Sequence, residues 1–472
     1  MKPRTKEFKQ AAVAAIGNKQ VQANLDGLYR GFHQARDQAA EETPGWEAMR
    51  DRARDVKAHT IDNLDYYLEM TERNVVAAGG NVFFSTDAES ATRYVIELAR
   101  SRGVRIVIKG KSMLSEEMGL NQRLEEEGIE PVETDLGEYI IQLADETPFH
   151  IIAPAIHKSQ QEVSNLFQEK HKTSPHDDIA ELTAEARVQL RDKFTRADMG
   201  ITGANFVVAE TGTVVLVTNE GNGRMCTSMP RIHVAIMGME RVVPSMEDMG
   251  LFLRLLVRSA TGQRLSSYVT TVTGPRADGA EDGPDEFHLV VVDNGRSRLL
   301  ASPELREALY CIRCGACLNA CPVYRKVGGH AYGWVYPGPI GAIVSPMLTS
   351  LSDARDLPHA STLCGNCREV CPVRIDMPRM LLHLRKEIAT GETYPGDRSA
   401  PLSERLAIKL WRMSVSSPFA MGVANRLGRL ALLPLRRGGS VARLPGPLEG
   451  WTRYRDLPAI ASRPFRARWR KP

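Results

Sequence analysis

Seven of the eight cysteines lie in two short runs in the last third of the chain. The first run reads Cys311-x2-Cys314-x2-Cys317-x3-Cys321-Pro322. Three thiolates at every third residue can each bind one iron of a cubane cluster, and the fourth, followed by proline, binds the other cluster in two-cluster ferredoxins. Structural zinc sites instead use cysteine pairs that are far apart in sequence, so the tight spacing favours iron–sulfur clusters over a single zinc ion.

The second run, Cys364-x2-Cys367-x3-Cys371-Pro372, lacks the first cysteine of this pattern. Ser361 stands at that position when the two runs are aligned on the Cys-Pro pair. Exchange of the fourth ligand between the runs predicts that Cys371 binds the cluster held by the other run. The predicted ligands are Cys311, Cys314, Cys317 and Cys371 for cluster one, and Cys321, Cys364 and Cys367 for cluster two.

Cluster two is left with three cysteine ligands. Such a site can hold a 3Fe-4S cluster, or a 4Fe-4S cluster whose last iron binds water, Ser361 or the nearby His359. We expect two 4Fe-4S clusters, the second of them site-differentiated, with a 3Fe-4S cluster as the alternative there. Residues 325–347, between the runs, are rich in glycine and aromatic residues. They form either a flap that controls solvent access to the clusters or an ordinary packed loop.

Short β-rich runs alternate with helical stretches between residues 76 and 297. The expected strands cover residues 81–87, 104–110, 149–155, 206–219, 233–239, 267–273 and 288–293, of which 206–219 form a hairpin. Continuous apolar strands separated by helices predict a mostly parallel sheet covered on both faces, with the hairpin inserted in that sheet. The eighth cysteine, Cys226, stands alone and is expected to be a buried, inert thiol.

Several polar side chains of this α/β region follow expected strands. They are Lys109, Lys111, Ser112, His157, Lys158, Glu210 and Glu220. The first three lie at the start of an expected helix, and helix N-termini attract anions. Each of the seven is a candidate for binding a small carboxylate or phosphate, and each is also explained by ordinary polarity at strand ends. No Gly-x-Gly-x-x-Gly follows the first strand, so the dinucleotide-binding fingerprint is absent.

The chain divides into four expected segments. They are a helical N-terminal segment (1–75), the α/β domain (76–297), a mostly helical ferredoxin-type iron–sulfur domain (298–390) and a basic C-terminal region (391–472). The net charge of the whole chain is +4. Residues 401–472 carry thirteen Arg and two Lys against two Glu and one Asp, a charge of +12 that leaves −8 for the rest. The basic end therefore needs a partner of its own.

The C-terminal region mixes apolar and basic residues between positions 405 and 437. Such a segment can lie on an anionic membrane surface or dock on an acidic protein surface. Pro418 and Pro434 break any long helix, which favours docking on protein. The region contains no recognised nucleic-acid-binding module, so nucleic acid is not expected as a partner.

The expected compartment follows from the apolar runs and the thiols. No run of 18 or more apolar residues is present, and the N-terminal apolar run is too short for a secretion signal. Clustered cysteines in a chain of 472 residues indicate metal ligands rather than the disulfides of a secreted protein. We therefore expect a cytoplasmic protein, with any membrane contact made by the basic tail.

Several long motifs together resemble one known family. They are GITGANFVVAETGTVVLVTNEGN (200–222), ERVVP (240–244), the stretch from the first cysteine run through GGHAYG (311–342), and CGNCREVCPVRIDMPRML (364–381). With these motifs, the chain resembles the lactate utilization protein B family essentially from end to end. Its seven clustered cysteines match the cluster ligands of that family, which lacks the eighth cysteine as well.

The resemblance implies an iron–sulfur electron-transfer subunit of a three-component system that oxidises L-lactate to pyruvate. It also implies two partners, a cysteine-rich-domain protein and a shorter protein with the same lactate-utilization domain. The α/β domain resembles the ribose-phosphate isomerase and CoA-transferase type of fold, although fold alone does not fix activity. The alternative is an enzyme in its own right, whose α/β domain performs the lactate chemistry or a CoA-type transfer.

Overall fold

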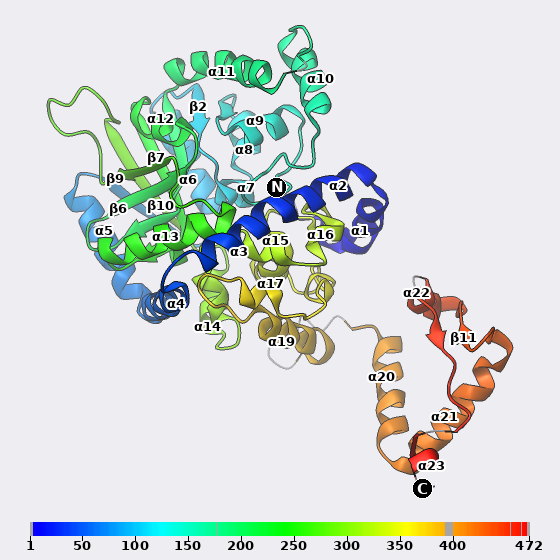
Figure 1. Cartoon of the computed structure of the whole chain (residues 1–472). Helices are drawn as coiled ribbons and strands as arrows, with labels where there is room; N and C mark the ends of the chain where they lie inside the picture. Colours follow the sequence, from blue (N-terminus) through cyan, green and yellow to red (C-terminus); the bar gives the residue numbers. More distant parts are fainter. Residues whose placement is uncertain (1–2, 177, 392–399, 454, 464, 470–472) are drawn as a thin grey trace. The chain divides into compact units, whose positions relative to one another are not determined.

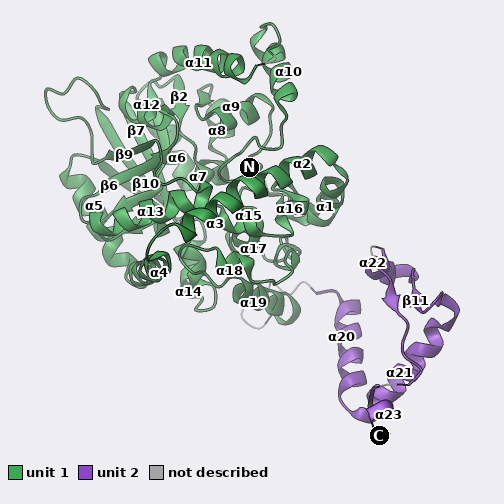
Figure 2. Ribbon diagram, in the orientation of Figure 1, with its two compact units in different colours: residues 1–398 green, residues 399–472 purple. Residues whose placement is uncertain are grey.

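The computed structural model describes residues 3–176, 178–391, 400–453, 455–463 and 465–469. The chain forms two compact units, residues 1–398 and 399–472 (Figure 2). The first unit holds a six-stranded sheet, a four-stranded sheet, the N-terminal helices and all eight cysteines. The candidate site is therefore built within one unit.

The six-stranded sheet has the strand order β1-β10-β7-β4-β2-β3 (Figure 1). All of its neighbouring strands are parallel, which confirms the predicted mostly parallel sheet. The strands are β1 (Asn81–Ser85), β2 (Ile106–Lys109), β3 (Glu130–Glu133), β4 (Met199–Gly203), β7 (Ile232–Gly238) and β10 (Glu286–Val292). The carboxyl ends of parallel strands gather at one edge, where the following loops can build a site.

Helices lie between these strands along the chain, and one follows the last strand. They are α6 (Ala88–Ser101), α7 (Met113–Met118), α8 (Leu120–Glu126), α9 (Leu136–Leu143), α10 (Gln160–His171), α11 (Ile179–Arg196), α12 (Asn222–Ser228), α13 (Met246–Thr261) and α14 (Arg296–Ala301). Val107 of β2 packs in an apolar cluster with α6, α7 and α8, whereas Ile106 and Ile108 pack in another with α9, α10 and α11. Because successive strand residues point to opposite faces, both faces of the sheet are covered.

The predicted hairpin is present as β5 (Phe206–Val208) and β6 (Thr213–Thr218), but it lies outside the parallel sheet. It belongs to a separate sheet with β8 (Val242–Val243) and β9 (Tyr268–Val272), in the order β8-β5-β6-β9. The prediction of an inserted hairpin is therefore wrong. The reason is that β5 follows β4 after two residues, too few for the crossover that a further parallel strand needs.

Residues 149–155, predicted as a strand, form bends and the start of a turn instead. Nδ1 of the buried His150 accepts hydrogen bonds from the backbone N–H groups of Ile152 (3.1 Å) and Ala153 (3.3 Å). These side-chain bonds replace the partners that a strand would offer. Phe149 and Ile151 are buried as their apolar character requires, but in the cluster that contains the cysteine segment.

The N-terminal helices and the cysteine segment lie side by side, although they are far apart in the sequence (Figure 1). The N-terminal helices are α1 (Phe8–Gly17), α2 (Lys19–Leu28), α3 (Gln34–Glu41), α4 (Trp46–Asp62) and α5 (Leu64–Ala77). The cysteine segment contains α15 (Ala316–Ala320), α16 (Tyr324–Val327), α17 (Gly338–Leu348), α18 (Asn366–Glu369) and α19 (Met377–Thr390). Every residue of α17 is buried, so the stretch between the cysteine runs is largely packed.

The second unit is smaller and mostly helical. Its elements are α20 (Leu402–Val415), α21 (Pro418–Leu432), α22 (Glu449–Thr452), α23 (Phe465–Trp469) and the two short strands β11 (Ser440–Val441) and β12 (Leu457–Pro458). Pro418 is the first residue of α21, so the helical region is interrupted there as predicted. Among the residues that the structure describes, no helix has the length and apolar character needed to cross a membrane.

Candidate iron–sulfur centre and adjoining cavity

The two cysteine runs fold into loops of the same shape. Left-handed backbone flanks one cysteine of each run, at Arg313 (φ 60°) and Gly315 (φ 77°) in the first and at Leu363 (φ 57°) and Gly365 (φ 89°) in the second. A non-glycine residue rarely adopts this conformation. A short helix then follows in both runs, α15 in the first and α18 in the second. The repeated geometry shows that the two loops are equivalent.

Ser361 holds the place in the second loop that Cys311 holds in the first. The backbone N–H of Arg313 donates to Sγ of Cys311 at 3.4 Å, and the N–H of Leu363 donates to Oγ of Ser361 at 3.1 Å. In both cases the donor lies two residues after the acceptor, within the same loop. The hydroxyl of Ser361 is therefore the group that replaces a thiol, whereas His359 is exposed outside this loop.

Four thiols from the two runs line one small enclosed space. Its walls include Cys311, Cys314, Cys317 and Cys371 together with apolar side chains such as Ile340. Burial raises the pKa of Cys371 to about 11, so its thiolate form needs a nearby cation such as iron. Four sulfur donors around one space are the donor set of a 4Fe-4S cluster, so these residues fit that group.

The remaining three thiols form a second group. Cys321 and Cys367 are buried, whereas Cys364 is exposed. Burial, followed by the charge of Cys364, raises the pKa of Cys321. Burial and then the charges of Cys321 and Cys364 raise the pKa of Cys367 to about 12. Cys364 is thus the one exposed cysteine of these three.

Two arginines of the N-terminal helices bind the backbone of the second cysteine run. Arg50, which is 2% exposed, donates from Nε to the carbonyl of Cys371 (3.1 Å) and from Nη2 to the carbonyl of Glu369 (2.5 Å). Arg36 donates from Nη2 to the carbonyl of Val370 at 3.2 Å. These contacts could not be predicted from the sequence, because isolated arginines on a polar helix have no distinctive spacing.

A cavity of about 280 Å³ lies beside the first thiol group. One wall is the carboxyl edge of the parallel sheet, where Gly110 follows β2, Gly203 ends β4 and Gly238 ends β7. The wall toward the cysteine segment includes Arg313 and Cys314. This is the position at which α/β sheets commonly bind small molecules.

The cavity and the thiol-lined space share part of their walls. Ile151, Arg313 and Cys314 line both of them. A small molecule in the cavity would therefore lie next to a cluster bound by the first thiol group. The bends at residues 149–155 supply this shared wall because Nε2 of His150 is fixed by Oδ1 of Asn319 in α15, at 3.0 Å.

The structure places three of the predicted anion-site residues at this cavity: Lys111, Ser112 and Glu220. Ser112 begins α7, where its hydroxyl accepts a hydrogen bond from the backbone N–H of Ser115. Nζ of Lys111 donates to the carbonyl of Ile152 at 2.7 Å. The loop after β2 thus fixes both side chains at the cavity wall.

Lys109 and Glu210 are not among the residues that line the cavity. Lys109 is fully buried, and its Nζ donates to Glu133 (2.5 Å) and to the amide oxygen of Asn121 (2.5 Å). Glu210 accepts a hydrogen bond from the backbone N–H of Met246 at 2.6 Å, at the start of α13. Both side chains have structural partners away from the cavity.

A network of charged groups that the sequence did not reveal surrounds Glu240 at the cavity. Arg296 is buried and pairs with Glu117 (2.9 Å) and Glu240 (2.9 Å). Arg241 and Arg313 each approach Glu240 to 3.8 Å. Burial would raise the pKa of Glu240, but these three arginines lower it to about 2. Glu240 therefore stays ionised and holds three guanidinium groups together.

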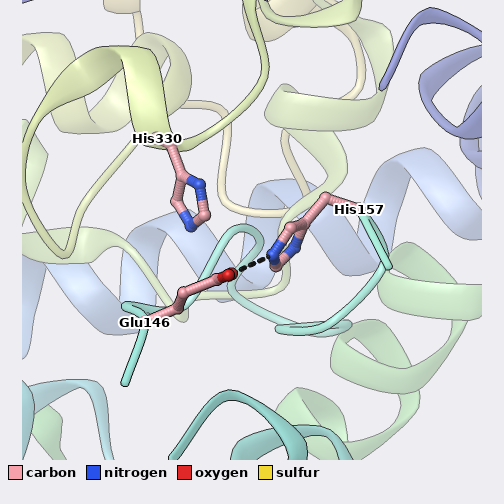
Figure 3. A group of neighbouring side chains, drawn as sticks. All are labelled: Glu146, His157 and His330. Carbon is pink, nitrogen blue, oxygen red and sulfur yellow. Dashed lines mark hydrogen bonds and ion pairs between the residues drawn. The ribbon is translucent and has the colours of Figure 1, made fainter. Parts of the chain in front are cut away.

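Glu146, His157 and His330 form a separate group of side chains (Figure 3). Oε2 of Glu146 lies 2.6 Å from Nε2 of His157, and the other carboxylate oxygen pairs with Lys158. Nε2 of His330 lies 2.7 Å from the carbonyl oxygen of Thr147. These contacts join residues 146–158 to the stretch between the cysteine runs. His157 and Lys158, predicted as anion ligands, are thus engaged with Glu146 and do not line the cavity.

Comparisons with known proteins agree along the chain. Residues 68–292 match the LUD domain, residues 307–375 the 4Fe-4S dicluster domain, and residues 384–472 the C-terminal domain of lactate utilisation protein B. Lactate utilization protein B of Bacillus velezensis is 45% identical, with 100% of this chain and 97% of that protein covered. The protein of the same name from Bacillus subtilis is 44% identical, with coverage of 100% and 96%.

Among solved structures, a DUF162 family protein from Deinococcus radiodurans is similar to part of the chain. The match covers 48% of this chain and 98% of that one, at 14% identity and a TM-score of 0.28. Likeness at this level carries no argument about function or detailed fold.

Proposed function

Because the chain belongs to the lactate utilization protein B family, we propose that it is the iron–sulfur electron-transfer subunit of a multi-component system that oxidises L-lactate to pyruvate. The family and the 4Fe-4S dicluster domain make it an iron–sulfur component of lactate utilization. The observation that carries the electron-transfer role is the meeting of thiols from both cysteine runs at one space. Sites of this kind transfer single electrons when they hold a cluster.

We infer two clusters with exchanged ligands. The first would be held by Cys311, Cys314, Cys317 and Cys371, which line one space although Cys371 belongs to the other run. The second would be held by Cys321, Cys364 and Cys367, with the hydroxyl of Ser361 or water at the remaining iron. The equivalence of the two loops, with Ser361 in the place of Cys311, supports this assignment.

The two proposed cluster sites would be shielded from solvent to different degrees. Cys314, Cys317 and Cys371 are buried, and α17 packs over the first site through Ile340. Cys364 is exposed at the second site. Burial and hydrogen bonding set the potential of such sites, so the exposed second site is the better exit point for electrons toward a partner.

A second candidate function places the lactate chemistry in this chain rather than in a partner. The cavity favours it, because that cavity shares Ile151, Arg313 and Cys314 with the first thiol group. In the leading proposal the partners are a cysteine-rich-domain protein and a shorter protein with the same lactate-utilization domain. The two candidates differ in whether the single chain, supplied with an artificial electron acceptor, oxidises L-lactate.

The test of cluster content is anaerobic purification followed by iron and sulfide analysis and EPR. We expect roughly seven to eight irons per chain. Cys371→Ser should disturb the first cluster and leave the second, although Cys371 lies in the second run. Cys364→Ser is the matched control from the same run and should disturb only the second. Loss of the second cluster alone in Cys371→Ser, or one zinc ion in place of iron, would overturn the assignment.

The test of the role itself is a lactate oxidation assay of the clustered protein with and without the two candidate partners. We expect turnover only with the partners present, and reduction of the clusters, seen by EPR, when lactate is added to the full mixture. Turnover by the single chain would instead establish the second candidate.

A further inference from the structure

Four cationic and three acidic side chains line the cavity at the carboxyl edge of the sheet. They are Lys111, Arg241, Arg296 and Arg313, and Asp135, Glu220 and Glu240. Arg296 is already satisfied by Glu117 and Glu240, at 2.9 Å each. Arg241 and Arg313 approach Glu240 only to 3.8 Å, which is longer than a hydrogen bond, so neither guanidinium group has a close carboxylate partner there.

Arg313 is held in place but not satisfied. Its guanidinium lies 4.2 Å from the centre of the Tyr336 ring, which fixes its plane. Nη2 is 3.8 Å from Glu240, and the buried Nη1 has no hydrogen-bond acceptor among the described residues. A buried donor without an acceptor is costly, and a ligand that accepts a hydrogen bond there would remove that cost.

Arg241 stands beside it with the same incomplete partner. Its Nε lies 3.8 Å from Glu240, longer than a hydrogen bond, and its side chain is 14% exposed. Lys111 approaches Glu138 only to 4.0 Å. Burial raises the pKa of Glu138, which weakens that carboxyl as a partner for Lys111. Lys111, Arg241 and Arg313 thus reach the cavity wall without a hydrogen-bonded carboxylate among the described residues.

We propose that this cavity binds the carboxylate of a small 2-hydroxy or 2-oxo acid, held by the guanidinium groups of Arg241 and Arg313. Arginine forks match a carboxylate with two parallel hydrogen bonds. The choice of acid class rests on the proposed function in lactate oxidation; the carboxylate rests on the two guanidinium groups that lack a close partner. Lys111, which lines the same cavity after β2, adds a third cation there.

The size and position of the cavity fit such a ligand. Its volume of about 280 Å³ is at the small end of ligand sites, enough for an acid with a short aliphatic part. Apolar side chains such as Ile151 and Met237 line it beside the cations. Because Arg313 and Cys314 also line the thiol-lined space, the bound acid would lie next to cluster one.

The experiment is titration calorimetry of the anaerobic, cluster-containing full chain with L-lactate, pyruvate, lactamide and inorganic phosphate. Lactamide has the shape of lactate without its charge. We expect L-lactate or pyruvate to bind at least about tenfold more tightly than lactamide, the ratio that one charge-assisted interaction of roughly 1.4 kcal/mol provides. EPR of cluster one, which should change when the acid is added, gives a second readout.

Arg241→Gln tests the assigned residue. It should weaken binding of the acid about tenfold or more, and Arg241→Lys should retain part of it because the charge stays while the fork is lost. Arg254→Gln is the matched control, since Arg254 is exposed on α13, a helix that borders the cavity, but does not line it. This variant should bind as the parent does.

Equal binding of lactamide and lactate, no binding of either acid, tighter binding of phosphate than of both acids, or unchanged affinity in Arg241→Gln would each overturn the inference. If Arg241→Gln does not fold, the comparison of lactate with lactamide on the unaltered chain still decides it. Failure of the proposed function is seen separately, as absence of clusters or of electron transfer by EPR. A chain with intact, reducible clusters that binds lactate no better than lactamide would therefore contradict this inference and leave the proposed function standing.

Discussion

At the scale of single residues, one oxygen distinguishes the second cluster site from the first in the proposed assignment. Oγ of Ser361 accepts the backbone N–H of Leu363 just as Sγ of Cys311 accepts that of Arg313. A hydroxyl is a weaker iron ligand than a thiolate, so the iron nearest Ser361 would exchange ligands more readily. The side chain that sits at this iron thus controls how well the second cluster survives oxygen.

Ser361→Cys should therefore complete the ligand set of cluster two. We expect slower loss of its absorbance and EPR signal in air and a changed EPR spectrum, because a fourth thiolate would bind the exposed iron. Thr362→Cys is the control, since residue 362 is exposed and adjacent but outside the equivalent position. If Ser361→Cys is spectroscopically identical to the parent, the backbone must hold residue 361 away from the iron.

Arg50, which lies outside the cysteine runs, binds the backbone of the second run. Arg50→Ala removes its hydrogen bonds to the carbonyls of Glu369 and Cys371, of which the bond to Cys371 is buried. We expect the free energy of unfolding to fall by about 3 kcal/mol, since a hydrogen bond to a charged group contributes roughly 1.5–3 kcal/mol. Chemical denaturation under anaerobic conditions measures it.

Arg54→Ala is the control for that loss. Arg54 is on the same helix, its side chain is 44% exposed, and its ion pair with Glu307 is on the surface. A surface pair contributes about 1 kcal/mol or less, so this variant should be nearly as stable as the parent. Equal losses in the two variants would show that Arg50 acts only through helix α4.

At the scale of elements, burial was easier to predict than pairing. Most strands of the parallel sheet were predicted because they are runs of apolar residues, but β3 and β4 were not. β3 reads Glu-Pro-Val-Glu, a polar run at a sheet edge, and β4 contains two glycines. The opposite error concerns residues 149–155, which are predicted as a strand. His150 hydrogen-bonds the local backbone there, so this apolar run is not a strand and instead forms a wall of the site.

The same limit applies to the site. The cluster cysteines could be predicted because their spacing is itself the signal, and Lys111, Ser112 and Glu220 because they follow strands. Arg241, Arg296 and Arg313 could not, since they meet only when β7 and the first cysteine loop come together in the fold. A single sequence also does not indicate that Glu240 lies close to all three arginines.

The two glycines before His330 allow the stretch between the cysteine runs to pack. A Cβ at Gly329 would lie 1.6 Å from the carbonyl oxygen of Phe149, and one at Gly328 (φ 65°) would lie 2.1 Å from its ring. Neither backbone nor ring can move that far without separating the stretch from residues 149–155. This close approach, together with the contact of His330 with Thr147, thus holds the stretch against the shared wall of the site.

Gly329→Ala should consequently destabilise the protein strongly and lower the amount of cluster one retained after purification. We expect a loss of several kcal/mol, because the clash is with backbone and must displace a buried segment. Gly27→Ala is the control: its Cβ would meet nothing within 4 Å, and alanine within a helix such as α2 should stabilise by up to about 1 kcal/mol. Normal stability and cluster content in Gly329→Ala would contradict the packing argument.

At the scale of the whole molecule, charge is divided between the two units. Residues 401–472 carry +12 and the rest of the chain −8. In α20 and α21 no residue is buried, and apolar side chains such as Trp411 (62% exposed) and Phe419 (82% exposed) stand beside the basic ones. A surface that exposes apolar and basic groups together is typical of a binding site for a protein or a membrane.

Removing residues 391–472 tests what that surface binds. The interruption between α20 and α21 at Pro418 leaves two short helices rather than one long interfacial helix, which favours docking on the acidic surface of a partner protein over a membrane. We expect the truncated protein to keep its full iron content, since all eight cysteines lie in the first unit, but to assemble poorly with the two candidate partners in anaerobic gel filtration.

Replacing Arg405, Arg412 and Arg429 by glutamine in the full chain is the matched control; it should weaken assembly in a salt-dependent way while keeping the apolar surface. Truncated protein that assembles normally, yet no longer sediments with anionic vesicles that the full chain binds, would show that the tail is a membrane-surface contact instead.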